Sequence, residues 1–162
     1  MKNIFKRKTI AKILLCVIWL GVIFYNGTRP AETSQKTSKE VIKVASSVMR
    51  VPATNVKKPG TKFIDVNYYV RKNAHFIQYF ILSIFLCSAV RTFKLYKTSE
   101  IFLLLFLLLL FPVIDEFIQK LVPGRTSLIF DVVIDFSGGV LALIISNIGY
   151  KFGKKKVAVK LS

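Results

Sequence analysis

Acidic residues and cysteines are scarce in this 162-residue chain. Eight Asp and Glu residues stand against 25 Lys and Arg, a formal net charge of +17. The two cysteines, Cys16 and Cys87, both lie inside long apolar runs, so neither a disulfide framework nor a cysteine-based zinc cluster is expected. The basic surplus does not predict nucleic-acid binding, because the basic residues flank apolar stretches and no nucleic-acid-binding motif accompanies them. Polybasic flanks of this kind typically meet anionic lipid headgroups.

Short motifs of the common enzyme classes are also missing. The sequence contains no nucleophile elbow, no spaced set of zinc ligands and no phosphate-binding loop. No small-x-small cleavage site follows the first apolar run, so we expect an uncleaved first helix. We therefore expect a protein that is not an enzyme, and we predict no cofactor and no metal site.

Long apolar segments are abundant. Hydrophobic residues make up 53% of the chain and the mean hydropathy is +0.52, both unusual for a soluble domain. Apolar stretches at about residues 10–26, 74–90, 100–122 and 128–149 are long enough to cross a bilayer as helices. The predicted fold class is all-α: a multi-pass membrane domain over residues 9–150 with four transmembrane helices.

A polar loop, residues 28–72, separates the first two predicted spans. Within it, apolar residues recur at helical spacing over Glu40–Arg50, which predicts an amphipathic helix on the membrane surface; a helix packed inside the loop is the alternative. The basic tails, residues 1–8 and 151–162, predict cytoplasmic termini and an extracytoplasmic loop by the positive-inside rule. The ten basic residues of the loop itself argue for the opposite orientation.

Four of the eight acidic residues fall within residues 113–139, at the end of the third span and the start of the fourth, where insertion scales put the cost of a carboxylate at about 2.5 kcal/mol or more. Alternating spans bring the start of the second, the end of the third and the start of the fourth to one membrane face. Spacings of three and four residues place polar side chains on shared helix faces. We therefore predict a ligand-binding polar cluster of Arg71, Lys72, His75, Gln78, Tyr79, Asp115, Glu116, Gln119, Arg125, Asp131 and Asp135.

Two local patterns predict tight packing near this cluster. Pro123 and Gly124 favour a type II turn, in which the glycine takes a positive φ. Gly138, Ala142 and Ser146 recur at every fourth position. Such a ridge of small residues is typical of closely packed helices in membranes.

Three spaced motifs carry a resemblance to a known family. They are Arg71-Lys72-x-x-His75-Phe76-x-x-Tyr79, Asp115-Glu116-x-x-Gln119-x-x-x-Pro123-Gly124-Arg125 and Asp131-x-x-x-Asp135-x-x-Gly138. These motifs resemble the VanZ-like family of bacterial membrane proteins. The resemblance implies a multi-pass protein of a Gram-positive plasma membrane, associated with low-level resistance to the glycopeptide teicoplanin. It implies no particular reaction.

We expect the cluster to be a binding pocket at the outer membrane face. Its basic residues would engage a membrane-lipid headgroup or a cell-wall precursor and so lower the effect of a glycopeptide. One alternative is a membrane-embedded hydrolase or transferase, with His75 as general base and with Glu116 and Asp131 or Asp135 orienting it or holding a divalent metal. Another is a lipid translocator that uses the acids as a relay; four spans are few for a pathway, so it would need a homodimer.

A purely structural role is the remaining alternative, because buried ionic groups can fix a fold without chemistry. Arg125 would then pair with Asp131, and His75 would bond to Glu116 or Gln119. Nucleic acid is not an expected partner under any of these hypotheses.

Overall fold

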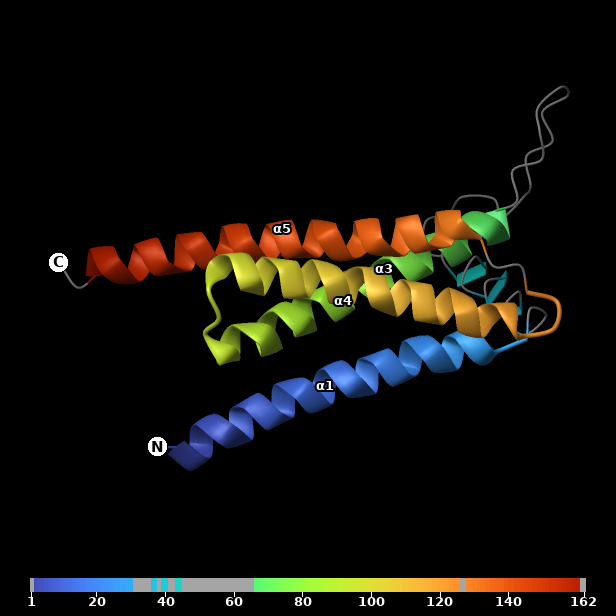
Figure 1. The fold of residues 1–162 in the computed structure, drawn as a ribbon. Coiled ribbons are helices and arrows are strands. Elements are labelled where there is room, and N and C mark those ends of the chain that lie inside the picture. The colour runs from blue at the N-terminus through green and yellow to red at the C-terminus, as the bar shows by residue number, and fades with distance from the viewer. Residues whose placement is uncertain are drawn as a thin grey trace, which may run out of the picture.

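The computed structural model describes residues 2–30, 36–37, 39–40, 43–44, 66–125 and 128–160, and no strand occurs within these ranges. Its elements are α1 (Lys2–Thr28), α3 (Val66–Val90), the 3-10 turn η1 (Arg91–Phe93), α4 (Lys97–Lys120) and α5 (Ile129–Lys160). The long helices run alongside one another in alternating directions, with both chain ends at the same end of the bundle (Figure 1). The predicted all-α fold is confirmed.

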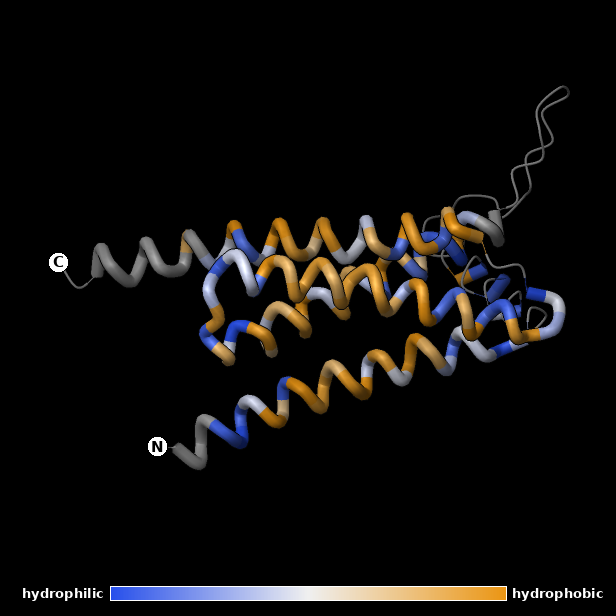
Figure 2. Tube along the Cα trace, in the orientation of Figure 1, coloured by the Kyte–Doolittle hydropathy of each residue, from blue (hydrophilic) through white to orange (hydrophobic). Residues whose placement is uncertain are grey.

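Four helical segments in the described part of the chain are long and apolar enough to cross a membrane: Lys6–Thr28, Tyr69–Phe93, Lys97–Lys120 and Ile129–Tyr150. Apolar residues cover the middle of the bundle and polar residues gather at its two ends (Figure 2). This distribution matches a bilayer's hydrocarbon core between two polar interfaces. The protein is therefore a multi-pass membrane protein.

The first loop differs most from the sequence expectation. Helix α3 begins at Val66, although the second span was predicted to begin at about residue 74, so the end of the predicted loop is helical. Polar residues among the first eight of α3 hid this helical segment in the hydropathy pattern. One of them, Asn73, donates a side-chain hydrogen bond to the Tyr69 carbonyl, one turn earlier in the helix, at 2.9 Å. The predicted amphipathic helix, Glu40–Arg50, lies largely outside the described residues and is not shown.

The apolar core runs along α3 and α4. Leu82, Leu104 and Leu108 are fully buried in it. Helix α1 joins through Trp19, whose ring meets that of Phe85 edge-on with the ring centroids 5.9 Å apart. The indole Nε1–H of Trp19 also donates to the backbone carbonyl of residue 78 at 3.0 Å. A buried indole N–H usually has such a hydrogen-bond partner. Here the bond fixes the position of α1 along the axis of α3.

Glycines bring α5 close to its neighbours. Gly138 lies against the backbone carbonyl of Phe76 so tightly that a Cβ at this position would overlap the carbonyl oxygen. Gly139 faces Leu108 of α4, with the Leu108 Cδ2 atom 2.8 Å from the position of a Cβ. Ala142, one turn beyond Gly138, is fully buried. At Gly138 the small-residue ridge therefore meets α3 at close range, the kind of contact that such residues allow between membrane helices.

Candidate functional site

The candidate site lies at the end of the bundle opposite the chain termini. There the end of α1, the start of α3, the end of α4 and the start of α5 come together beside the hairpin that joins α4 to α5 (Figure 1). Alternating helix directions produce this meeting, and it brings into one region residues that are far apart in the sequence.

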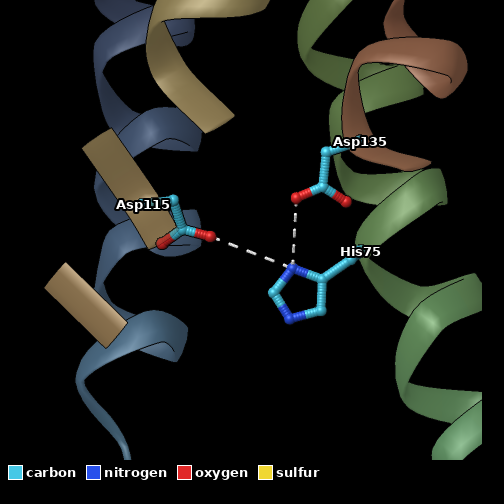
Figure 3. Close-up of side chains that lie close together, drawn as sticks. All are labelled: His75, Asp115 and Asp135. Carbon is cyan, nitrogen blue, oxygen red and sulfur yellow. Dashed lines mark ion pairs between the residues drawn. The ribbon is translucent and has the colours of Figure 1, made fainter. Parts of the chain in front are cut away.

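Three ionisable side chains from three helices form the buried centre of the site: His75 of α3, Asp115 of α4 and Asp135 of α5. The three groups form a triangle in which one imidazole nitrogen faces both carboxylates (Figure 3): Nδ1 lies 3.9 Å from Asp115 Oδ2 and 3.7 Å from Asp135 Oδ2. The aspartate side chains are 0% and 1% exposed, against 19% for His75. Both distances exceed the range of about 2.7–3.2 Å for an N–H···O hydrogen bond, so the imidazole is near both acids and bonded to neither.

Hydrogen bonding at this centre is uneven. Gln119, one turn beyond Asp115, donates its Nε2–H to Asp115 Oδ2 at 2.9 Å. Neither carboxylate oxygen of Asp135 has a hydrogen-bond partner among the described residues, and nor has the buried hydroxyl of Tyr79. Buried polar atoms are usually paired. An acid without a bonded partner is therefore the feature of this centre that most needs a physical explanation.

A small pocket opens beside the buried centre. It is lined by Arg71, Lys72, His75, Gln119, Asp131 and Asp135, and it has room for roughly one water molecule or ion. Lys72 forms an ion pair with Asp131. Arg71 has no ion-pair or hydrogen-bond partner among the described residues, and its side chain is half-buried at the rim.

The hairpin between α4 and α5 contains a β-turn and is held by a hydrogen bond to Glu116. The Arg125 N–H donates to the Val122 carbonyl at 3.2 Å and Gly124 has φ 76°, as predicted for a type II turn. Glu116 Oε2 accepts the backbone N–H of Leu128 at 3.1 Å. Because Leu128 directly precedes α5, this bond satisfies an N–H that the helix itself leaves unpaired.

Arg125 joins the hairpin to α1. Its Nη1–H donates to the carbonyl of Gly27 at 2.7 Å, in the last turn of a helix, where carbonyls lack helical partners. A Cβ at Gly27 would overlap the Asp115 carboxylate, so a larger residue at this contact would displace the Asp115 side chain. Burial, and next the charge of Arg71, lower the pKa of the Arg125 guanidinium, but the usual value is so high that the group stays charged.

These pairings differ from those expected of a purely structural hairpin. Arg125 bonds to a backbone carbonyl and not to Asp131, which pairs with Lys72 instead. His75 faces the two aspartates instead of Glu116 or Gln119. Sequence spacing placed these groups at the same end of the bundle, but it could not say which side chain meets which.

Six of the eleven predicted site residues line the pocket. Tyr79, Asp115, Glu116 and Arg125 do not line it, although Asp115 belongs to the buried centre and Glu116 and Arg125 hold the adjoining hairpin.

Gln78 makes no side-chain hydrogen bond with the site in the described part of the chain. It is not among the pocket-lining residues, and its backbone carbonyl accepts the bond from Trp19. Sequence reasoning in turn missed Gly27, whose contribution is a backbone carbonyl and an absent side chain. Only its position at the end of an apolar helix could have pointed to it.

Sequence reasoning also missed a second polar network, at the opposite end of the bundle. Arg91 Nε and Lys97 Nζ lie 3.3 Å and 3.1 Å from Glu100 Oε1, and both side chains also donate to Asn147 Oδ1. The three-residue spacing of Lys97 and Glu100 could have predicted their ion pair. The participation of Asn147 could not have been predicted, because this residue lies on another helix.

Fold and site together define a class: an α-helical multi-pass membrane protein with an acid-base cluster between its helices at one end of the bundle. The chain belongs to the VanZ/LLP1 family, whose sequence profile matches residues 12–150. This match confirms the family resemblance carried by the three sequence motifs. Neither the curated proteins nor the solved structures contain a match to the chain.

Proposed function

We propose that this protein is a cell-envelope membrane protein whose pocket engages the phosphate of a membrane lipid or of a lipid-linked wall precursor, lowering susceptibility to teicoplanin. One observation carries the proposal. Three cationic side chains, Arg71, Lys72 and Arg125, which we call the basic rim, lie beside the buried acidic centre. Arg71 and Lys72 line the pocket, and Arg125 donates to the carbonyl of Gly27, a residue that lies against the Asp115 carboxylate.

The basic rim suits a phosphate because much of its hydrogen-bonding capacity is unused. Arg125 commits one N–H group to the Gly27 carbonyl, whereas a guanidinium has five N–H donors. Arg71 makes no hydrogen bond within the described ranges. Charge-assisted hydrogen bonds from arginine to phosphate are among the strongest that proteins form, and basic pockets between transmembrane helices are typical headgroup sites.

Exposed apolar residues beside the rim supply a place for the rest of a lipid. Leu121, Ile129 and Phe130 flank the hairpin and are 75%, 85% and 75% exposed. The pocket itself is too small for a whole headgroup, so the phosphate would sit on the rim while the acyl or isoprenoid chain follows these side chains. We place this end of the bundle at the outer membrane face, as the basic tails predict.

Arg71→Gln tests the proposal in cells. The substitution removes a rim charge that has no bonded partner within the described residues, so the fold should survive it. Expression of the unaltered protein in a susceptible Gram-positive host should raise the teicoplanin concentration needed to stop growth, and Arg71→Gln should abolish that rise. Lys120→Gln is the matched control, because Lys120 is exposed at the same end and does not line the pocket. Equal protection by the two variants at equal membrane abundance would refute the proposal.

Binding to vesicles identifies the source of the phosphate. The purified protein should bind vesicles that contain an undecaprenyl pyrophosphate lipid, or an anionic phospholipid, more tightly than neutral phosphatidylcholine vesicles. Losing one charge-assisted hydrogen bond of about 1.5–3 kcal/mol in Arg71→Gln corresponds to about 10- to 100-fold weaker binding. A preference for the pyrophosphate lipid points to a wall precursor, and equal binding of both points to a general headgroup site.

Catalysis is the second candidate, and the position of His75 supports it. Histidine is the side chain that most often acts as a general base, His75 lines the pocket, and the basic rim would hold the phosphate of a lipid substrate beside it. Release of inorganic phosphate from an isoprenoid pyrophosphate by the purified protein, lost in His75→Gln, would establish a hydrolase. Binding without turnover would leave the first candidate alone.

A further inference from the structure

We propose that His75, Asp115 and Asp135 hold a divalent transition-metal ion inside the bundle, and that Zn²⁺ fits this donor set best. The inference goes beyond the proposed function and does not depend on it. It uses the buried centre and not the basic rim, and it needs no lipid.

The spacing of the three side chains is that of ligands around a small cation. One donor atom from each lies within 4.8 Å of the other two, and His75 Nδ1 is 3.9 Å and 3.7 Å from the nearest carboxylate oxygens. A tetrahedral Zn²⁺ with bonds of about 2.0–2.1 Å keeps its ligands about 3.3 Å apart. The three groups thus need to close by between a few tenths of an ångström and about 1.5 Å, within the reach of side-chain rotation.

The lack of other partners points to a ligand. Both oxygens of Asp135 are buried without a hydrogen-bond partner among the described residues, and so is Asp115 Oδ1. Two carboxylates that face each other in a low-dielectric interior repel unless a proton or a cation lies between them. The nearby basic side chains do not pair with the two aspartates within the described residues: Lys72 pairs with Asp131, Arg125 reaches the Gly27 carbonyl, and Arg71 forms no ion pair.

The surroundings also have the features of a metal site. Gln119 donates to Asp115 Oδ2 at 2.9 Å, the kind of outer hydrogen bond that orients a ligating carboxylate. The three ligands come from α3, α4 and α5, so the binding of an ion would lock three helices together. Because one donor is an imidazole nitrogen, the set favours Zn²⁺ or a neighbouring transition metal over Mg²⁺ or Ca²⁺, which prefer oxygen ligands alone.

Three protein ligands leave a coordination position open, as in catalytic and not in structural zinc sites. Two of the three, His75 and Asp135, also line the pocket. An ion held here would therefore present its open position toward the pocket, where a water molecule or an anionic oxygen fits.

Metal binding by the purified full-length protein tests the proposal. The protein is produced with a tag that contains no histidine, stripped with a chelator, and titrated with ZnCl₂ in detergent micelles against a fluorescent competitor. We expect one Zn²⁺ per chain with a Kd below about 1 µM, and no comparable binding of Mg²⁺ or Ca²⁺. Asp135→Asn and His75→Gln should weaken binding by about 100-fold or more, because loss of an outer partner alone costs about 10- to 100-fold.

Two controls separate this site from other metal binders. Glu100→Gln removes a buried carboxylate at the opposite end of the bundle and should leave binding unchanged. The double variant Cys16→Ser, Cys87→Ser removes both thiols and should bind Zn²⁺ as the unaltered protein does. Dependence of binding on either cysteine would overturn the assignment.

X-ray absorption spectroscopy of the Zn²⁺-loaded unaltered protein covers the case in which a ligand variant fails to fold. The proposal requires one imidazole with oxygen ligands in the first shell. A shell that contains sulfur, an all-oxygen shell, or no binding tighter than about 100 µM would refute it. Lipid binding that depends on Arg71 does not require the metal ion. A negative result for metal binding would therefore refute this proposal without refuting the proposed function.

Discussion

Replacing Gly138 with alanine should push α3 and α5 apart. The added Cβ would overlap the backbone carbonyl oxygen of Phe76, and it would also lie 3.2 Å from the Phe76 ring. A backbone carbonyl in the middle of a helix cannot rotate away as a side chain can. The helices themselves must therefore separate, and His75 and Asp135, next to the contact on each side, would move with them.

The size of the effect follows from two opposing contributions. Overpacking of a well-packed interior costs about 1–3 kcal/mol, and contact with backbone puts Gly138→Ala at the upper end. Replacing glycine by alanine in a helix gains about 0.5–1 kcal/mol. We therefore expect Gly138→Ala to lower the free energy of unfolding by about 2 kcal/mol.

The same helix provides the controls. Gly149 has no atom within 4 Å of the added Cβ, so Gly149→Ala should be neutral or slightly stabilising. Gly139→Ala should fall between the two, because the Cβ would meet the end of the Leu108 side chain, 2.8 Å away, and this side chain can change its rotamer. The predicted order of stability is Gly149→Ala, then Gly139→Ala, then Gly138→Ala.

Unfolding by sodium dodecyl sulfate in mixed micelles measures this order. Circular dichroism follows the helices, while the fluorescence of Trp19, the only tryptophan, follows the contact between α1 and α3. If Gly138→Ala is as stable as Gly149→Ala, α3 and α5 are not packed as described, and the placement of His75 beside Asp135 fails with them.

Two further predictions concern single carboxylates. Glu116→Ala should cost about 1 kcal/mol in the same assay, because the N–H of Leu128 loses its acceptor at the start of α5; a hairpin held by its turn alone would show no change. Glu100→Gln should cost about 1–3 kcal/mol, since Arg91 and Lys97 lose their shared carboxylate. Because half of the Lys97 side chain is exposed, the loss of unfolding free energy in Glu100→Gln should be smaller in high salt. A loss that does not depend on salt would contradict the ion pairing.

The sequence predicted the features that depend on composition and chain order. Apolar length determined the four spans. Alternating helix directions then placed His75, Asp115 and Asp135 at one end of the bundle without knowledge of any contact. The positive φ of Gly124 followed from its position after a proline in the turn.

The features that depend on individual side-chain contacts could not be predicted from the sequence. Polar residues (Asn67, Arg71, Lys72 and Asn73) interrupt the apolar ones at the start of α3, so the hydropathy pattern did not reveal that the helix already begins at Val66. The partner of Asp131 was expected to be Arg125 under the structural hypothesis but is Lys72; both cations lie at the correct end, and only the rotation of α3 decides between them. Gly27 could not be found by chemistry, because its role is to have no side chain beside Asp115.

The charges of the candidate site are unbalanced in a way that favours ligands over a purely structural role. Glu116 and Asp131 each have a partner that fastens a helix, but Asp135 is buried with no bonded partner in the described ranges. A hairpin selected only for stability would gain from an apolar residue there, because an unpaired buried charge is costly. A divalent cation at the buried centre would offset this charge and leave the basic rim with a positive excess. A phosphate on the rim would offset that excess in turn, so the two proposals support each other electrostatically while remaining separately testable.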